Sequence, residues 1–453
     1  MIFAFLDSYG IGANDVSNSF SAAVGSRALT LKQAVLIASV CEFLGAFLMG
    51  SSTADTIKGG LIDVSLFALD PALLMLGMVC SLVGSSTWVL FASSRGWPVS
   101  TTHAIVGAIT GIGIAGFGGS AVRWAEIGKI VASWLVSPVC AGLVTAIVFL
   151  TTKFFILRHD DSLKRGLRAI PFYFAITIFI NVFYIVFKGS PGLNLSKMPI
   201  GVILGISFGV AGAVFLWCQF FLKPYLQRKI ENEEQLSWHH SFWIPFVKPR
   251  PLVPPNSAPS SVKTLRVDTG YSLNEKHPDS SPLSPDGLKA RTLEEALHEK
   301  EMQDTGTVNS DLAALDDTPP PSRAKALLGY LKAKVMHGVE QDIHESTAEV
   351  DQIHDSSTKY DRKTELLFCT LQVLTSCFAS FAHGSNDVAN AIGPLTTIYY
   401  IWKNGAVDIS GKSPIPTWIL AYGGVAIDLG LLTYGYKVMA TLGNKITYMS
   451  PSR

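Results

Sequence analysis

Charged residues are scarce in this 453-residue chain, at 16%, while hydrophobic residues reach 48%. A soluble domain carries about 25% charged residues. The mean hydropathy of +0.33 and the 39 glycines are typical of packed membrane helices. The net charge of +1 gives no basis for a nucleic-acid partner. We therefore predict an all-α, polytopic membrane protein, because lipid cannot satisfy the edge of an open sheet.

The cysteines and the N-terminus lack the patterns of a metal site and of a secretory leader. No two cysteines have CxxC or other metal-ligand spacing, so we expect reduced packing residues and no resident cofactor. All six lie in apolar runs, at Cys41, Cys80, Cys140, Cys218, Cys369 and Cys377. No basic lead precedes Asp7, so a cleavable signal peptide is not predicted.

Hydrophobic runs near 20 residues predict about ten membrane segments. In chain order they are Met1–Ala22 with a break, Leu31–Gly50, Pro71–Ser93, Pro98–Gly118, Glu126–Leu150, Ile170–Lys188, Pro199–Leu222, Thr364–Ala382, Asn386–Trp402 and Pro416–Tyr436. The fourth of these follows a Gly/Pro break and is a candidate for a re-entrant segment. The loop before the seventh is predicted outside and carries a sequon at Asn194, a candidate glycosylation site.

A polar stretch at residues 223–363 separates two groups of segments. Its Pro, Ser and charged residues predict a mostly disordered loop. Basic residues in the loop 151–169 place that loop in the cytoplasm and, by counting segments, residues 223–363 as well. Apolar residues at helical spacing near 324–345 predict an amphipathic helix on the membrane or the bundle, with a solvated helix as the alternative. Residues 1–222 then form a transmembrane region with a first repeat, and residues 364–453 begin a second, incomplete repeat.

One motif occurs twice in these apolar surroundings, as GANDVSN at Gly12–Asn18 and as GSNDVAN at Gly384–Asn390. The copies lie 372 positions apart (386 minus 14). Carboxylate and amide groups at bilayer depth are costly unless they bind something, so the duplication predicts a site shared by two repeats. We expect the glycines of the motif to break the helix and expose backbone ligands. The alternative is that these polar groups only join helices by hydrogen bonds.

The side chains of the duplicated motif are suited to a small cation. Asp15 and Asp387 supply anionic oxygens, and four asparagines supply neutral ones. These are Asn14, Asn18, Asn386 and Asn390. Such a mixture of ligands fits either a sodium ion or a proton.

Three hydroxyl residues, Ser100, Thr101 and Thr102, follow Pro98 at a predicted helix start. Hydroxyls and free amides at a helix N-terminus suit a tetrahedral oxyanion. An ordinary capped helix is an equal alternative. His103, which comes next, is interpreted as structural.

Two further acids lie within apolar segments, at Glu42 and Asp428, and are candidate pathway residues. When Gly45 is aligned with Gly430, the two acids miss each other by one position, so their equivalence is left open. Each either lines the pathway or pairs with a buried partner.

The two motif copies, the PVSTTH stretch and the run Phe381–Pro394 together resemble the PiT family of inorganic phosphate transporters. The long polar loop resembles that of fungal, sodium-coupled members. The resemblance implies an inverted-repeat transporter with broken helices and a re-entrant hairpin. It implies phosphate binding by Asp15, Asn18, Ser100, Thr101, Thr102, Asp387 and Asn390, and sodium binding by Asn14, Asp15, Asn386 and Asp387.

The resemblance further implies import of phosphate with sodium as the coupling ion, by alternating access, in the plasma membrane. Its partners are then phosphate, sodium and the lipid bilayer, and a homodimer is a candidate assembly. The family has a longer apolar lead and a second hairpin, so we expect this chain to be truncated at both ends. A proton-coupled permease for phosphate or another tetrahedral oxyanion is one alternative, and a non-transporting membrane sensor is another. No nucleophile elbow, metal-ligand cluster or nucleotide loop indicates an enzyme.

Overall fold

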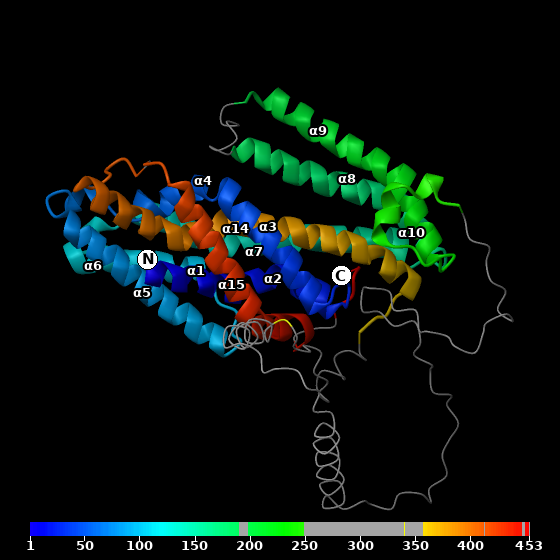
Figure 1. Ribbon diagram of the computed structural model, residues 1–453, viewed down its shortest axis with the longest axis horizontal. Helices are drawn as coiled ribbons and strands as arrows, with labels where there is room; N and C mark the ends of the chain where they lie inside the picture. The colour runs from blue at the N-terminus through cyan, green and yellow to red at the C-terminus, as the bar shows by residue number, and fades with distance from the viewer. Residues whose placement is uncertain (190–197, 249–338, 340–356, 412, 446–448, 453) are drawn as a thin grey trace, which may run out of the picture. The chain divides into compact units, whose positions relative to one another are not determined.

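The protein was analysed as a computed structural model, which describes residues 1–189, 198–248, 339, 357–411, 413–445 and 449–452 (Figure 1). These residues are helical apart from turns, loops and one isolated bridge between Ile62 and Val122. Seven helices in the described part are long and apolar enough to cross a membrane. The prediction of an all-α, multi-pass membrane protein is thus confirmed. Asn194 and nearly all of the segment 324–345 lie outside the described residues.

The helices follow the predicted segments closely. They are α1 (Ile2–Asn14), α2 (Val16–Gly25), α3 (Leu31–Met49), α4 (Ser51–Asp55), α5 (Pro71–Ser94), α6 (Thr101–Phe117), α7 (Trp124–Thr152), α8 (Ser162–Lys188), α9 (Ile200–Trp217), α10 (Lys223–Ile230), α14 (Arg362–Asn404) and α15 (Thr417–Ala440).

Local sequence explains several of the helix ends. Thr30 and Gln33 form a capping box at the start of α3. The carboxylate of Asp361 accepts a hydrogen bond from the amide of Thr364 and so caps α14. Gly405 ends α14 with a φ of 66°, a left-handed conformation that glycine adopts without steric cost.

The first copy of the motif interrupts its helix, but the second does not. Asp15 alone separates α1 from α2, and it keeps a helical φ of −82° and ψ of −37°, so the interruption is one residue long and no turn is unwound. In contrast, α14 runs without interruption for 43 residues, through both Thr364–Ala382 and Asn386–Trp402. The prediction of two segments there was wrong.

The glycines of the motif serve close helix packing instead. A Cβ atom at Gly12 would overlap the carbonyl oxygen of Ile427 in α15, and one at Gly384 would overlap the carbonyl oxygen of Glu42 in α3. The absent side chain therefore lets two backbones touch, which is the use of small residues that membrane helix pairs favour.

These two contacts are copies of each other. Gly12 matches Gly384 at the motif's spacing, and α1 packs along α15 as α14 packs along α3. Two more contacts complete the pattern: Gly430 meets the carbonyl of Tyr9, and Gly45 meets the carbonyl of Phe381. By this correspondence the counterpart of Glu42 is Ile427, not Asp428, so the two acids hold different places in the two repeats.

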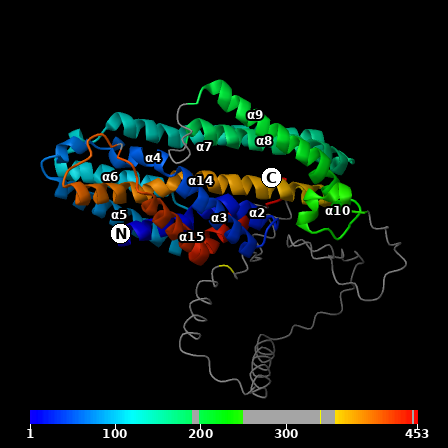
Figure 2. The same cartoon turned by 45° about the horizontal axis from the view of Figure 1, so that its top comes forward.

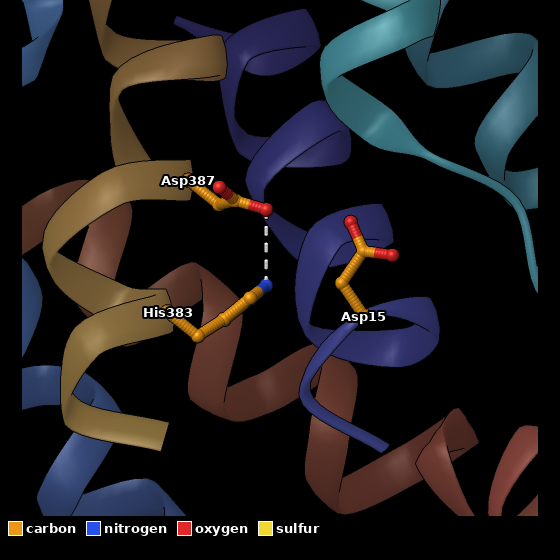
Figure 3. A group of neighbouring side chains, drawn as sticks. All are labelled: Asp15, His383 and Asp387. Atoms are coloured by element: carbon orange, nitrogen blue, oxygen red, sulfur yellow. Dashed lines mark ion pairs between the residues drawn. The ribbon is translucent and has the colours of Figure 1, made fainter. Parts of the chain in front are cut away.

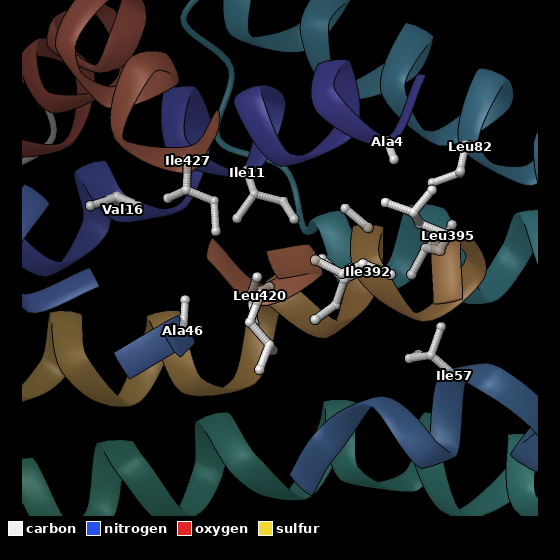
Figure 4. Close-up of a cluster of buried hydrophobic side chains, with 14 of the residues drawn as sticks. Ala4, Ile11, Val16, Ala46, Ile57, Leu82, Ile392, Leu395, Leu420 and Ile427 are labelled. Atoms are coloured by element: carbon white, nitrogen blue, oxygen red, sulfur yellow. The ribbon is translucent and has the colours of Figure 1, made fainter. Parts of the chain in front are cut away.

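The matching helices α1 and α14 run in opposite directions. Asp15 lies beside His383 and Asp387, whereas Ser8, two turns earlier in α1, shares its neighbour Gly423 with Ile392, further along α14. Figure 4 shows the same order, with Ile11 beside Ile392 and Ala4 toward Leu395. An antiparallel relation of equivalent helices is the arrangement of an inverted repeat.

Helices α5 and α6 form a re-entrant hairpin. Its open ends meet where the amide of Asp63 donates to the carbonyl of Ala121, and its tip, residues 95–100, ends at Asp15. Asp15 lies midway along the α1–α2 pair. The tip therefore stops partway along the bundle.

The outer helices are much less buried than the central ones. Only 11% of the most apolar stretch of Trp124–Leu157 is buried, against 50% for Thr417–Gly443. Helices α8 and α9 pack side by side and away from the centre (Figure 2). An apolar surface of this kind suits the hydrocarbon of a bilayer.

Candidate functional site

Asp15, between α1 and α2, is hydrogen-bonded to the first residue of α6. The Oδ2 atom of Asp15 accepts a 2.6 Å hydrogen bond from Oγ1 of Thr101 and a longer one, of 3.4 Å, from the Thr101 amide. Asp15 and Thr101 are both buried. A carboxylate at a helix N-terminus is favourably placed against the positive end of the helix dipole.

The second repeat reaches the same hairpin tip through Asn390. Its side-chain nitrogen donates to Oγ1 of Thr102 at 3.0 Å and to Oγ1 of Thr101 at 3.3 Å. Helices α1, α6 and α14 therefore meet at one cluster of polar atoms. This convergence confirms that the duplicated motif and the hydroxyl residues, which are far apart in the sequence, are neighbours in space.

His383 connects two acids on the other side of Asp15. Its Nε2 atom lies 3.1 Å from Oδ2 of Asp387, one helical turn along α14 (Figure 3). Its Nδ1 atom lies 2.9 Å from Oε2 of Glu42. The Nδ1 contact with Glu42 has hydrogen-bond geometry, whereas the Nε2 contact with Asp387 is a close approach without it. Single ligand atoms of Asp15, His383 and Asp387 lie within 4.8 Å of one another.

Glu42 is fully buried and bonded on both oxygens. Its Oε1 atom accepts a 2.7 Å hydrogen bond from Ser380, and its Oε2 atom faces His383. Of the two readings given for Glu42, pairing with a buried partner is therefore the one that the contacts favour. Asp428 is only partly buried, and its Oδ1 atom has no hydrogen-bond partner among the described residues.

Asn14 is hydrogen-bonded to the hairpin tip and to the end of α5. Its side-chain nitrogen donates to Oγ of Ser93 and to the carbonyl of Trp97, and its oxygen accepts from the amide of Val99, at 2.9–3.0 Å. These bonds use both ends of the amide. Asn14 thus acts on the site by fixing the tip that carries Thr101.

Asn386, the counterpart of Asn14, is bound to a different element. Its Oδ1 atom accepts from Nζ of Lys188 at 2.6 Å and from the hydroxyl of Tyr184 at 3.3 Å, both in α8. The second repeat therefore places an ammonium group where the first repeat places backbone and hydroxyl groups. The two halves of the site are chemically unequal.

Two predicted residues lie apart from this cluster of hydrogen bonds. Asn18 is exposed on α2. Ser100 caps α6, since its hydroxyl accepts from the amide of His103 at 3.3 Å. His103 is exposed and packs on the ring of Trp134, which agrees with the structural role predicted for it.

Sequence reasoning missed three contributors, His383, Ser380 and Lys188. His383 lies four residues before Asp387, so helical periodicity puts both on one face, and that signal could have identified it. Ser380 lies on the same face of α14, one turn before His383. Lys188 gave no such signal, because its contact joins positions 198 apart in the chain.

The arrangement can bind a cation and an oxyanion side by side. Carboxylates of Asp15 and Asp387 offer hard oxygen ligands, whereas Thr102 and Asn390 offer hydroxyl and amide donors within the same cluster. Two antiparallel repeats that share such a site within a membrane bundle define a secondary transporter.

Comparison with known proteins identifies the family. The sequence profile described as "Phosphate transporter family" matches residues 11–453, and the chain belongs to this family of transporters, which are not enzymes. The chain is 35% identical to the "Phosphate-repressible phosphate permease pho-4" of Neurospora crassa, over 100% of this chain and 83% of the relative. It is 33% identical to "Sodium-dependent phosphate transporter 2" of Homo sapiens, over 96% of this chain and 82% of that protein. A solved structure titled "The sodium-dependent phosphate transporter" matches with a TM-score of 0.61 and 27% identity, over 100% of this chain and 78% of that one.

Proposed function

We propose that this chain imports inorganic phosphate across the plasma membrane together with sodium, by alternating access of its two inverted repeats. The observation that carries the proposal is the meeting of the buried Asp15, the partly buried Asp387 and the hairpin tip at one cluster. The names of the relatives, a phosphate permease and sodium-dependent phosphate transporters, support the same substrate and the same coupling ion.

Within this proposal, sodium binds at Asp15 and Asp387. Carboxylate oxygens are the ligands that a hard cation prefers, and the described residues of the cluster contain no thiol. Asn14 and Asn386 act as positioning residues, because their amides are engaged with the tip and with Lys188. They are assigned to orient the site rather than to coordinate the ion in this state.

Phosphate binds against the tip, to Thr101, Thr102 and Asn390. The N-terminus of α6 adds a favourable dipole for an anion. Ser100 contributes by capping that helix, so that its first turn stays formed at the site.

Coupling follows from the charges in this cluster. Two unit charges about 4 Å apart repel by about 4 kcal/mol at the effective dielectric of a partly buried site, so phosphate beside Asp15 and Asp387 is disfavoured until a cation neutralises them. A cation without the anion gains less, because it then lacks the attraction of the phosphate charge beside it. Each ligand therefore raises the affinity of the site for the other, and this coupling is what symport requires.

The experiment is uptake of radiolabelled phosphate by this chain in cells that lack their own phosphate carriers, with external sodium replaced by choline. Sodium-dependent uptake above the empty-vector control is expected. Equal uptake in sodium and choline, with a response to external pH, would replace sodium by protons as the coupling ion. Absence of uptake by correctly inserted protein would overturn the transport proposal and favour a sensor.

A further inference from the structure

A second buried carboxylate lies on α1, at Asp7, two turns before Asp15. Asp7 is 0% exposed, and neither of its oxygens has a hydrogen-bond partner among the described residues. Asp15, in contrast, is held by Thr101. A fully buried carboxyl group without a partner costs several kcal/mol if it is ionised, so its state requires an explanation.

The carboxyl group of Asp7 is closed in by its own helix and by α5, and it forms no hydrogen bond with any of the described residues. The hydroxyl of Ser85 in α5 faces the carboxyl without hydrogen-bonding geometry, and the hydroxyls of Ser85 and Ser8 also lack partners in the described part of the chain. One turn further along, a Cβ atom at Gly10 would lie 2.9 Å from a methyl group of Val89. Helices α1 and α5 therefore touch one turn away from Asp7.

The charged groups on the neighbouring helices are engaged elsewhere. Helix α5 has none between Pro71 and Ser94. On α14, His383 pairs with Glu42 and Asp387, and on α15 the ammonium of Lys437 is bound to the carbonyl of Ser94. The negative charge of Glu42 acts on Asp428 in α15, and the negative charge of Asp15, just after the end of α1, acts on Asp7.

We propose that Asp7 is a proton-binding site, separate from the cluster at Asp15 and Asp387, that holds a proton while α1 and α5 are packed together. A neutral carboxylic acid can be buried at this interface, whereas a carboxylate cannot without a donor or a cation. When the hairpin of α5 and α6 moves away from α1 and the interface opens to water, Asp7 releases its proton, and it must regain it before the interface closes again.

The transport consequence rests on the proposed function. If each cycle requires Asp7 to be protonated before α1 and α5 can close, alkaline conditions slow the wild type at this step. The variant Asp7→Asn is permanently neutral and has nearly the same shape, so it is free of this requirement.

The first test is the ratio of sodium-driven phosphate uptake in Asp7→Asn to that in wild type at each pH. Taking the ratio cancels the change in ionisation of phosphate itself. Between about pH 6 and about pH 9, which brackets the range where buried carboxylic acids exchange protons, we expect the ratio to rise at least about threefold. Asp63→Asn, at an exposed loop carboxylate, is the matched control and should keep a constant ratio. A flat ratio for Asp7→Asn overturns the transport role.

The second test does not depend on transport. Infrared difference spectra of wild type minus Asp7→Asn, in detergent at neutral pH, should contain the C=O stretch of a protonated carboxylic acid. A carboxylate band in its place overturns the proposal whether or not the protein carries phosphate. If wild type shows no uptake while the acid band is present, the proposed function fails and the proton site stands.

Discussion

Oγ1 of Thr101 lies 2.6 Å from Oδ2 of Asp15, and this one hydrogen bond joins the broken first helix to the tip of the re-entrant hairpin. Because Asn390 of the second repeat donates to the same hydroxyl, Thr101 is where three separate parts of the sequence meet. A movement of either repeat against the hairpin must therefore change the contacts of Thr101. Thr101 therefore links Asp15, a proposed cation ligand, to Asn390, a proposed oxyanion ligand.

Removing this hydroxyl should weaken substrate binding strongly. A hydrogen bond to a charged group contributes about 1.5–3 kcal/mol, so Thr101→Val should raise the phosphate KM by about tenfold or more. Thr110→Val is the control, because Thr110 lies on the same helix and its hydroxyl bonds only to the carbonyl of Val106 one turn back. Uptake kinetics at saturating sodium measure both. Equal KM values for the two variants would remove Thr101 from the site.

The two aspartates of the motif should be required for uptake but not for insertion. Asp15→Asn and Asp387→Asn keep the shape of the side chain and remove the charge to which sodium binding is assigned in the proposal, so uptake is expected to fall to the level of vector-containing cells. Asp161→Asn, at an exposed carboxylate paired with Arg165, should transport normally. Surface labelling would verify that all three variants reach the membrane. Normal sodium-dependent uptake in either motif variant contradicts its assignment.

The pairing of His383 with Glu42 should matter for stability as well as for transport. Breaking a buried ion pair by removing one partner costs about 3–5 kcal/mol, because the other charge remains buried. We expect His383→Gln to lower the thermal stability of the detergent-solubilised protein, and the double variant with Glu42→Gln to recover part of the loss. If the two substitutions have simply additive effects, the proposed pairing contributes nothing.

The polar site was more predictable from the sequence than the way in which its residues are supported. The apolar segments and the repeated motif were sufficient to predict a helical bundle with a site shared by Asp15 and Asp387, and the family resemblance added Thr101 to it. The asymmetry was not predictable, because two copies of one motif imply equal surroundings, whereas Asn14 binds the hairpin and Asn386 binds Lys188. Continuity of α14 was missed for a related reason. Glycine favours both a helix break and a close helix crossing, and only the neighbouring helix decides between them.

That ambiguity can be resolved experimentally at Gly384. If its role is close packing against Glu42, Gly384→Ala should destabilise the protein at the upper end of the range of about 1–3 kcal/mol typical of overpacking, because the added methyl group meets a backbone carbonyl that cannot move aside. If its role were only a flexible helix, alanine would be tolerated or stabilising. Gly107→Ala in α6 is the matched control, since a Cβ placed there would meet no atom within 4 Å apart from its chain neighbours and the nearby backbone of its own helix. Thermal unfolding of the purified variants should give a lower midpoint for Gly384→Ala and an unchanged or higher one for Gly107→Ala. Equal midpoints would show that the crossing of α3 and α14 does not depend on the missing side chain.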